Sequence, residues 1–580
     1  MTETVDLAQY LWTRLAQLKV GSIHGVPGDY NLTLLDAIKS SGIGWVGNAN
    51  ELNSGYAADG YARIKGISAL ITSFGPGELS AVNAIGGAYA EKAPIVHIVG
   101  TPPLVAQRAG ACLHHSLGDG NFRVFADIQK SITVAQANLK DVSTAPQMID
   151  GVLKECLRHS QPVYIEVPTD MVKAQVPAPT SLLDLSITNY DESYEDQVVD
   201  TLVTRIQQSR KSLILVDMFA GRFDIKDEIN ELAKLTGIPV LTTPGGKGIV
   251  GEALPNFHGV HFGSAGTTEH HAWANSRDLV LRFGPLNSET NTFGFTAVPN
   301  PQVTITFDKY AIHWDGCNDV DRTLSLKSAL QKLCERLGSV QLLAPEPYPT
   351  ECPSYEKMLK DLPTPKEDDM VDQYSFWLFI SKFIREGDII LTETGTASYG
   401  GQSLFLPDNT TFINSTIWLS IGYMLAAAQG ASLAQREMQQ DGTRPPGRTI
   451  LFEGDGSLQM TAQSISDMIR NKLDIIIFVL NNRGYTIERI IHGFEENYND
   501  VQPWRNLEAP SYFGAPKNDP TYPVNTFLAN NWGELQTVIQ KTELQEGKGL
   551  TMIEVTMDMA DAPQSLVLFV QYLIKRNRGE

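Results

Sequence analysis

Residues 448–482 carry the clearest structural signal in the chain and read RTILFEGDGSLQMTAQSISDMIRNKLDIIIFVLNN. Two apolar runs, at 449–452 and 475–480, have the length and the β-branched content of buried strands. Between the runs, apolar residues recur at steps of three or four, as on a helix packed against a sheet; these residues are Leu458, Ala462, Ile465 and Ile469. The stretch therefore predicts a βαβ unit in which one helix joins two parallel strands.

Asp455 and Asn482 follow the two predicted strands and are separated by 482 − 455 = 27 residues. Open α/β sheets bind ligands at the carboxyl ends of neighbouring parallel strands, where both side chains would emerge. Carboxylate and amide oxygens are hard ligands suited to Mg²⁺ or Ca²⁺. Gly456 and Ser457 would open the helix, and its free amides can bind a phosphate. Each motif alone is usually a structural turn, but together they predict a site for a metal ion and a phosphate.

The rest of the chain alternates in the same way. Strand-like runs separated by helix-length segments lie at 69–74, 95–100, 163–167, 213–216, 279–283 and 303–307. This pattern predicts an α/β fold class of doubly wound parallel sheets, each covered by helices on both faces. Stretches at about 176–196 and 345–369, both with prolines and acidic residues, are typical of linkers. We therefore expect three domains, at 1–178, 195–345 and 368–580. The first and third have similar length and strand spacing, which leaves an ancestral duplication open.

The overall composition excludes several classes of protein. A chain of 580 residues with 42% hydrophobic and 19% charged residues has the make-up of a globular enzyme. Its net charge of -20 would repel nucleic acids and anionic membranes. No window approaches the ~20 apolar residues of a membrane span, and the five scattered cysteines form no CxxC motif. We expect a cytoplasmic protein with no nucleic-acid or membrane partner.

Two motifs of the second domain are expected to be structural. The sequence PGGKG at 244–248 lacks the order GxxxxGK[ST] of a phosphate-binding loop, so a tight turn after a strand is the better interpretation. The adjacent pair His270 and His271 has no flanking motif that would indicate a site.

Further motifs extend the signal over nearly the whole chain. They are GVPGDYN at 25–31, ANELN at 49–53, YAADGYAR at 56–63, the pair His114 and His115, ETGT at 393–396, and GYTIE at 484–488. In this order, and together with the unit around Asp455 and Asn482, they resemble the fungal pyruvate decarboxylases, a family of thiamine-diphosphate-dependent 2-keto acid decarboxylases. The resemblance implies a pyrimidine-binding, a middle and a diphosphate-binding domain, and a homotetramer built of dimers.

The resemblance also implies which residues bind the cofactors thiamine diphosphate and Mg²⁺. The metal ligands would be Asp455, Asn482 and the backbone carbonyl of Gly484. Ile421 would bend the cofactor, and Leu419 and Thr396 would contact the edge of its pyrimidine. The full set expected around the cofactor is Thr396, Leu419, Ser420, Ile421, Asp455, Gly456, Ser457, Asn482, Arg483, Gly484, Tyr485, Thr486, Ile487 and Glu488.

The catalytic residues implied by the resemblance come from two domains. Glu51 would hydrogen-bond the pyrimidine ring nitrogen of the cofactor. The proton carriers that the reaction requires would be Asp29, His114, His115 and Glu488. In this family the first domain of one subunit meets the third domain of another, so catalysis would need at least a homodimer.

Three readings of the function remain open. The first is decarboxylation of pyruvate to acetaldehyde and CO₂, with Thr396, Ile487 and, more weakly, Phe295 around the substrate side chain. The second is decarboxylation of a larger 2-keto acid such as indolepyruvate or phenylpyruvate. The third is a cofactor-binding regulatory relative without activity, against which the five retained catalytic residues argue. The histidine pair argues against an acetolactate-synthase-like enzyme.

The sequence departs from the family pattern at three places. Pro76 stands where yeast-type relatives commonly have valine, and proline fixes φ and removes a donor. Residues 216–222 lack the cysteine pair that the budding-yeast enzyme uses in substrate activation. Arg483 stands where an aspartate is often found, which reverses the local charge beside the predicted metal site.

Overall fold

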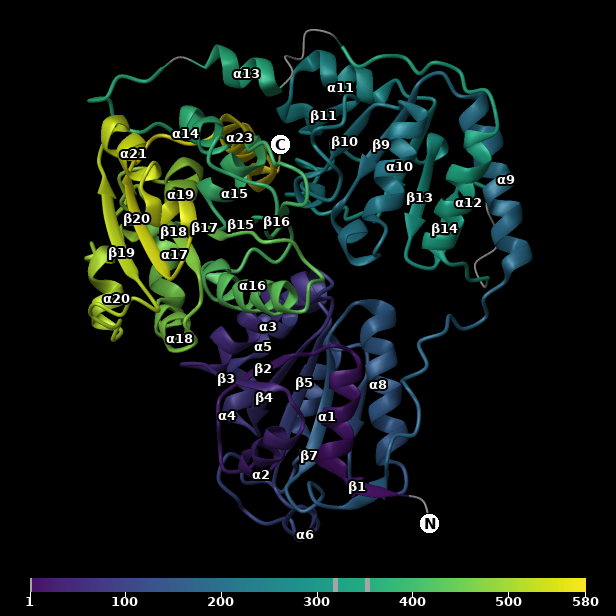
Figure 1. Ribbon diagram of the computed structural model, residues 1–580, viewed down its shortest axis with the longest axis vertical. Coiled ribbons are helices and arrows are strands. Elements are labelled where there is room, and N and C mark those ends of the chain that lie inside the picture. Colours follow the sequence, from purple (N-terminus) through teal and green to yellow (C-terminus); the bar gives the residue numbers. More distant parts are fainter. Residues whose placement is uncertain (1–2, 317–321, 350–354, 363, 580) are drawn as a thin grey trace.

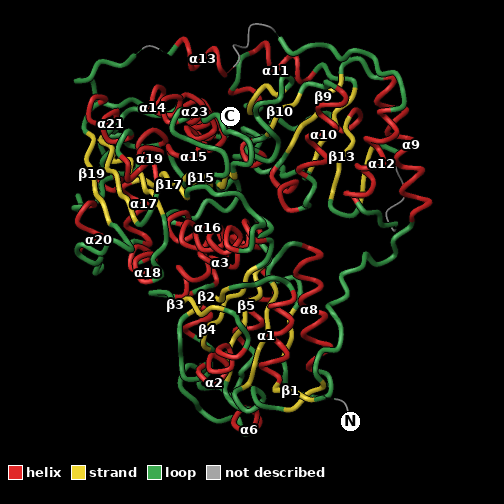
Figure 2. The backbone as a smooth tube through the Cα atoms, in the orientation of Figure 1, coloured by secondary structure: helices red, strands yellow, loops and turns green. Residues whose placement is uncertain are grey.

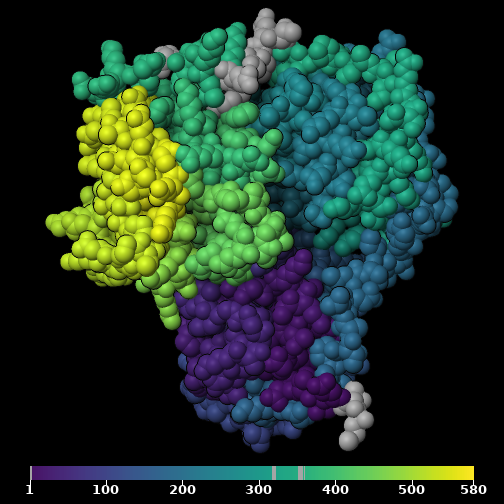
Figure 3. Space-filling model, in the orientation of Figure 1, coloured from purple at the N-terminus to yellow at the C-terminus, as the bar shows by residue number. Residues whose placement is uncertain are grey.

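The computed structural model describes residues 3–316, 322–349, 355–362 and 364–579, and it contains three six-stranded sheets with helices around them. In Figure 1 the first domain lies at the bottom, the middle domain at the upper right and the third at the upper left. The strands lie inside and the helices outside (Figure 2), as the alternating pattern predicts. The three regions pack directly on one another (Figure 3).

The first and third sheets have the same topology. The first has the order β3-β2-β4-β5-β7-β6, and the third has the order β16-β15-β17-β18-β20-β19. Numbered within each sheet, both orders become 2-1-3-4-6-5, and neighbouring strands are parallel throughout. This shared order is what a duplication would leave. The strands of the first sheet are β2 (Ser22–Gly25), β3 (Gly44–Gly47), β4 (Ser68–Ser73), β5 (Ile95–Thr101), β6 (Gln136–Asn138) and β7 (Val163–Pro168). Those of the third are β15 (Ile389–Thr392), β16 (Thr411–Ile413), β17 (Thr449–Gly454), β18 (Ile475–Asn481), β19 (Val524–Ala529) and β20 (Leu550–Thr556).

The middle sheet has the order β11-β10-β9-β12-β13-β14, and its edge strand β14 is antiparallel, which the sequence pattern does not predict. Its strands are β9 (Ser212–Val216), β10 (Val240–Thr242), β11 (Phe257–Val260), β12 (Leu279–Phe283), β13 (Thr304–Asp308) and β14 (Ala311–Trp314). The PGGKG motif forms a tight turn after β10, as predicted. The Lys247 ammonium forms an ion pair with Glu252 at 2.9 Å. His271 faces the carbonyl of Thr296 and His270 packs against Tyr348, so both are structural here.

The helices around the first sheet are α1 (Leu7–Gln17), α2 (Leu32–Asp36), α3 (Glu51–Lys65), α4 (Pro76–Ser80), α5 (Val82–Ala90), α6 (Leu104–Arg108), α7 (Val124–Gln129) and α8 (Ala145–His159). Those of the middle region are α9 (Glu192–Gln208), α10 (Lys226–Thr236), α11 (Thr268–Asn275) and α12 (Leu326–Gly338), followed by α13 (Tyr355–Asp361). Those of the third are α14 (Gln373–Ile380), α15 (Thr396–Gly400), α16 (Tyr423–Gln440), α17 (Asp455–Thr461), α18 (Ser464–Arg470), α19 (Thr486–Ile491), α20 (Ala509–Tyr512), α21 (Trp532–Ile539), α22 (Thr542–Glu546) and α23 (Gln564–Arg578).

The predicted linkers carry some structure of their own. In the first, β8 (Gln175–Pro177) pairs with β1 (Thr4–Asp6). In the second, α13 forms, whereas residues 350–354 and 363 lie outside the described residues. The exact domain limits stay a prediction.

The predicted βαβ unit is present, with one difference in its helix. Alternate residues of β17 and β18 enter different cores: Leu451 and Ile477 pack on one face, and Phe452 and Phe478 on the other. The single predicted helix is wrong, because the segment forms α17 and α18. At the junction the Ile465 amide donates to the carbonyl of Ala462 at 3.0 Å, three residues back instead of four, so the α-helical hydrogen-bond pattern is interrupted there.

Helices α3 and α16 join the first and third domains at the centre of Figure 1. They cross closely because both carry glycine at the contact. A Cβ at Gly60 would lie 2.1 Å from the carbonyl oxygen of Ala427, and one at Gly430 would lie 1.8 Å from that of Ala57.

We therefore predict that Gly60→Ala destabilises the protein, by at least the 1–3 kcal/mol, roughly, that overpacking costs. The melting temperature should fall. Gly151→Ala, in the middle of α8, is the matched control because nothing lies within 4 Å of the added carbon. It should raise stability by up to about 1 kcal/mol, since alanine is the better helix former. Equal melting temperatures for the two variants would contradict this account of the helix crossing.

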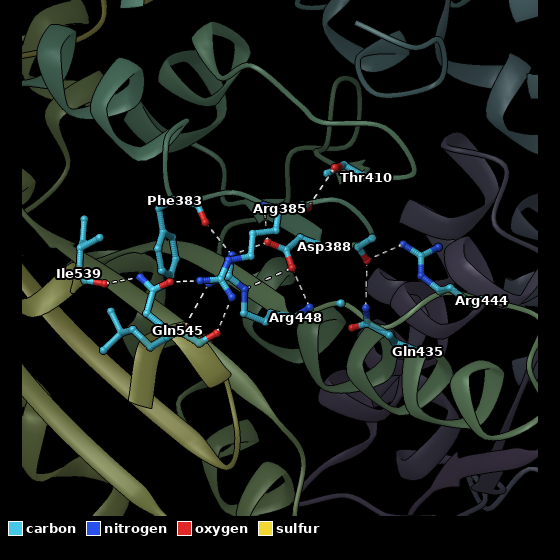
Figure 4. Close-up of polar contacts among 12 residues, drawn as sticks. Phe383, Arg385, Asp388, Thr410, Gln435, Arg444, Arg448, Ile539 and Gln545 are labelled. Carbon is cyan, nitrogen blue, oxygen red and sulfur yellow. Dashed lines mark hydrogen bonds and ion pairs between the residues drawn. The ribbon is translucent and has the colours of Figure 1, made fainter. Parts of the chain in front are cut away.

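A buried ion pair fixes the amino-terminal edge of the third sheet (Figure 4). Asp388 precedes β15 and Arg448 precedes β17; the Arg448 Nη2 lies 2.6 Å from the Asp388 Oδ2, and its backbone amide donates to Oδ1 at 2.8 Å. The guanidinium also donates to the carbonyls of Phe383 and Leu544. Buried charges are stable only when they are fully paired in this way. The network anchors the edge opposite the candidate site.

Candidate active site

The carboxyl edge of the third sheet holds a small cavity of about 50 Å³. The loops after β15, β17 and β18 supply most of its wall, as expected where parallel strands end. The predicted cofactor residues that line it are Thr396, Ile421, Asp455, Gly456, Ser457, Asn482, Gly484, Tyr485, Thr486, Ile487 and Glu488. Of the remaining predicted residues, Leu419 lines an adjoining cavity, the Ser420 hydroxyl bonds that of Tyr56, and the Arg483 side chain is exposed.

Three oxygen atoms converge in this cavity. The Asn482 Oδ1 lies 3.1 Å from the Asp455 Oδ1 and 3.0 Å from the carbonyl oxygen of Gly484. The amide nitrogen of Asn482 points away and donates to the Thr486 hydroxyl at 2.8 Å. Without a cation, the reversed amide would be favoured, because it would bring a donor to both oxygens. Octahedral Mg²⁺ at 2.0–2.1 Å places neighbouring ligands about 3.0 Å apart, so the three positions have the spacing of a Mg²⁺ ligand set when Asn482 presents its amide oxygen.

Backbone geometry supports this cluster. Gly484 has φ +122° and donates its amide to the Asp455 Oδ2 at 3.0 Å, and Arg483 before it is left-handed at φ +61°. Burial raises the pKa of Asp455 to about 6, although the amide bonds oppose the shift. A bound cation would favour the charged carboxylate.

Two buried glutamates lie behind the cavity on β17 and after β15. Burial raises the pKa of Glu393 to about 7. Burial, and then the charge of Glu393, raise the pKa of Glu453 well above its ordinary value, although the Ser457 side chain opposes the shift. The raised pKa favours the neutral form of Glu453. The sequence does not reveal this, because a glutamate two residues before Asp455 looks like any polar residue at a strand end.

The raised pKa of Glu453 predicts how the stability of the folded protein depends on pH. In the unfolded chain a glutamate ionises near pH 4.3, roughly, while folded Glu453 remains protonated above that value. The folded state then binds more protons, so stability falls as pH rises through this window. Glu453→Gln removes this contribution, and its melting temperature relative to the wild type should be higher at about pH 7.5 than at about pH 5. Glu546 is exposed, so the Glu546→Gln variant shows the change in melting temperature with pH that is expected when no buried carboxyl group is removed. If the difference in melting temperature between Glu453→Gln and the wild type did not change with pH, the raised pKa of Glu453 would be contradicted.

A second group of predicted residues lies at the carboxyl edge of the first sheet. Glu51 is the first residue of α3, whose N-cap Asn50 accepts from the amide of Asn53 at 2.9 Å. Partial burial raises the pKa of the Glu51 carboxyl. Its Oε1 faces Gly77, where a Cβ would lie at 3.2 Å. Pro76 is the first residue of α4, a position where no amide donor is needed.

Asp29, His114 and His115 form the other part of this group. The His114 Nε2 lies 2.6 Å from the Asp29 Oδ2, and the imidazole stacks on Tyr30 at 4.9 Å between ring centroids. His115 is left-handed at φ +67°, and its carbonyl lies against Gly75, where a Cβ would be only 2.3 Å away. A loop therefore brings two adjacent histidines to one place, as predicted.

The chain does not bring its two groups together by itself. No first-domain residue is among those that line the two cavities at the third sheet, in the part of the chain that the structure describes. Glu488 lies with the third-domain group, apart from the other proton carriers.

A larger cavity of about 380 Å³ adjoins the first and shares Thr394, Gly395, Ile421, Ile487 and Glu488 with it. Helix α23 forms one wall through Leu566, Phe569, Val570, Leu573 and Arg576. The Arg576 guanidinium also pairs with Glu289 of the middle domain at 2.5 Å. Phe295 does not line this cavity and is 53% exposed; its neighbour Phe293 is buried against Tyr399 and Phe569. The sequence gives no signal for the α23 wall, because its residues lie far from every motif.

The loop that carries Leu419 and Ile421 is held from the first domain. The carboxylate of Glu91 accepts hydrogen bonds from the Ser415 hydroxyl at 2.6 Å and the Thr416 amide at 3.0 Å. Leu419 is left-handed at φ +54° and donates its amide to the Ser415 hydroxyl at 2.9 Å. A non-glycine residue in this conformation costs about 1–3 kcal/mol and is typical of functional sites.

Three parts of the chain match models of one enzyme family. Residues 5–120 match the thiamine pyrophosphate enzyme, N-terminal TPP binding domain; residues 199–333 match the central domain; and residues 393–554 match the C-terminal TPP binding domain. Thus the chain is an enzyme of the thiamine pyrophosphate class.

Curated relatives narrow this class. A pyruvate decarboxylase of Aspergillus parasiticus is 45% identical over 100% of this chain and 99% of its own length. One of Aspergillus fumigatus is 41% identical over 100% of the chain and 98% of its own length, and isozyme 2 of Saccharomyces cerevisiae is 39% identical over 99% of both. The chain belongs to the thiamine pyrophosphate enzyme family, in the group of the fungal pyruvate decarboxylases. The predicted family and fold class are confirmed. Among the described helices, none has the length and apolarity to cross a membrane.

Proposed function

We propose that the protein is a thiamine-diphosphate- and Mg²⁺-dependent decarboxylase that converts pyruvate to acetaldehyde and CO₂. The observation that carries the proposal is the convergence of oxygens from Asp455, Asn482 and Gly484, in a chain whose relatives are pyruvate decarboxylases over their full length. When bound, the cofactor supplies an acceptor for the electrons that CO₂ leaves on the acyl carbon. The enzyme is proposed to act in the cytoplasm.

The chain's own residues would bind, orient and exchange protons. Asp455, Asn482 and the Gly484 carbonyl would hold Mg²⁺, and the Leu419 carbonyl and Ile421 would orient the pyrimidine. The carboxyl group of Glu51, whose pKa burial raises, would share a proton with the pyrimidine nitrogen. Asp29, His114, His115 and Glu488 would carry protons to and from the substrate.

We further propose a homodimer as the minimal active unit, within a homotetramer. The two residue groups of one chain are separate, so each site needs a second copy. Exposed apolar side chains stand within five residues of proposed site residues in both domains: Leu32, Leu117, Trp418 and Met460. Exposed apolar side chains at scattered positions are common on protein surfaces, so the dimer proposal rests on the separation of the two residue groups.

Purified protein with Mg²⁺ and thiamine diphosphate should release CO₂ and acetaldehyde from pyruvate, measured through NADH consumption by added alcohol dehydrogenase. Metal removal by EDTA should abolish turnover, and added Mg²⁺ should restore it. Absence of turnover with saturating cofactors would overturn the proposal and favour the regulatory alternative.

The cavity of about 380 Å³ favours one second candidate, a larger 2-keto acid such as phenylpyruvate or indolepyruvate. Its wall of Ile487, Leu566 and Phe569 is apolar and would favour a large side chain. We expect a higher kcat/KM for pyruvate than for phenylpyruvate. The opposite ratio would make the larger acid the substrate.

A further inference from the structure

Asp29, His114 and His115 have a property that proton transfer alone does not require. One ligand atom from each lies within 4.8 Å of the others, and all three residues are exposed. Across the described ranges of the chain, no other group of three or more His, Cys, Asp or Glu residues meets this criterion.

The donor set is that of a transition-metal site. Two imidazole nitrogens and one carboxylate oxygen suit Zn²⁺, Co²⁺, Ni²⁺ and Cu²⁺, whereas Mg²⁺ prefers oxygen alone. The cluster around Asp455 and Asn482 offers only oxygen, so the chain contains two sites of different metal preference.

The His114 and Asp29 ligand atoms need little movement, and the His115 ring nitrogen lies within 4.8 Å of them. Tetrahedral Zn²⁺ with ligands at 2.0–2.1 Å separates them by about 3.3 Å. The pair His114 Nε2 and Asp29 Oδ2, at 2.6 Å, must open by less than about 1 Å. In the single chain the side chains of His114 and Asp29 are 58% and 50% exposed, so packing within the same chain leaves both side chains room to adjust.

The surroundings orient the histidines as they do in metalloproteins. Tyr30 stacks on His114 with an interplanar angle of 11°, and its hydroxyl lies 3.4 Å from the Nδ1, so the Nε2 is the atom that faces Asp29. A fixed outer partner on the second ring nitrogen is typical of metal-binding histidines. The left-handed backbone of His115, packed against Gly75, directs its ring toward His114 at 4.7 Å between centroids.

We propose that Asp29, His114 and His115 bind a divalent transition-metal ion of the Zn²⁺ class, and that the bound ion inhibits the enzyme. Three protein ligands leave a fourth position for water. The inhibition follows because the ion occupies the lone pairs that would exchange protons, and this part rests on the proposed function of these residues. The binding of the metal ion does not depend on the proposed function.

The test titrates the holoenzyme, saturated with Mg²⁺ and thiamine diphosphate, with Zn²⁺ and separately with Co²⁺. Zn²⁺ binding is followed by calorimetry. Co²⁺ reports the site by its visible absorption, which is strong in a tetrahedral site with nitrogen ligands and weak in an octahedral oxygen site. We expect one ion per chain, a strong Co²⁺ band, and loss of pyruvate turnover that EDTA followed by fresh Mg²⁺ reverses.

Variants assign the ligands. His114→Gln and His115→Asn should each weaken Zn²⁺ binding by more than the roughly 10- to 100-fold that loss of an outer-sphere partner costs. Asparagine is chosen at position 115 because it tolerates the left-handed backbone. The double variant His270→Gln/His271→Gln, at the other adjacent histidine pair, should bind Zn²⁺ as the wild type does.

Unchanged Zn²⁺ affinity in both ligand variants would overturn the proposal, as would a weak Co²⁺ band that excess Mg²⁺ removes, because the ion would then occupy the oxygen site. Tight Zn²⁺ binding with full turnover would overturn the inhibitory part. A protein that binds Zn²⁺ as expected but turns over no 2-keto acid would contradict the proposed function and leave the metal site standing.

Discussion

Glu51→Gln should lower kcat for pyruvate by about 10²- to 10⁴-fold, the range that a positioned proton-transfer group contributes. Glutamine has nearly the shape of glutamate but cannot share an acidic proton with the pyrimidine nitrogen. Burial raises the pKa of Glu51, in the direction that favours the protonated form of the carboxyl group. Because Glu51 does not line the third-domain cavity, metal affinity should change far less than turnover.

The measurement is single-substrate kinetics at saturating cofactor, with cofactor binding followed in parallel. Glu192→Gln is the matched control, since Glu192 is also the first residue of a helix, α9, but lies exposed in the middle domain. It should leave kcat unchanged. Unaltered turnover in Glu51→Gln would remove our account of cofactor activation.

The third sheet was the easiest part of the fold to predict. Strands buried on both faces read as continuous apolar runs, so β17 and β18 could be located within about a residue. The edge strand β14 could not be predicted as antiparallel, because its direction depends on the short turn after β13. The break between α17 and α18 is a local change to hydrogen bonds three residues back, which the spacing of apolar residues does not reveal.

The candidate site also contains residues that the sequence predicts and residues that it does not predict. Asp455 and Asn482 could be paired from spacing alone, because they end neighbouring strands of one βαβ unit. The wall of the larger cavity could not, since Glu289 and Arg576 are 287 positions apart and meet only through packing of α23 on the middle domain. Phe295 is the weaker candidate for the substrate pocket, and the backbone turns its side chain outward while it buries Phe293.

Asp455→Asn should strongly lower turnover, because it weakens metal and cofactor binding. The substitution removes the charge from the three-oxygen cluster and places a donor beside Asn482. Hydrogen bonds to charged groups contribute about 1.5–3 kcal/mol, so we expect Mg²⁺-dependent cofactor affinity to fall roughly 10- to 150-fold. Quenching of intrinsic fluorescence by thiamine diphosphate measures this, and the exposed Asp441→Asn gives the control.

The apoprotein should tolerate the change. Burial raises the pKa of Asp455 to about 6, so the wild-type carboxylate is itself unfavourable without a cation. The melting temperature of apo Asp455→Asn should therefore equal or exceed that of the wild type, while added cofactor and Mg²⁺ should stabilise only the wild type. A destabilised apo variant would show that Asp455 has a structural role instead.

Mixing the two impaired variants tests the shared site directly. If each site takes Glu51 from one subunit and Asp455 from the other, a dimer of one Glu51→Gln chain and one Asp455→Asn chain contains one intact site and one doubly altered site. Random reassembly of equal amounts should then recover about a quarter of wild-type activity, because half the dimers are mixed and half their sites are intact. A site contained within a single chain would give no recovery, since every chain would carry one of the two substitutions.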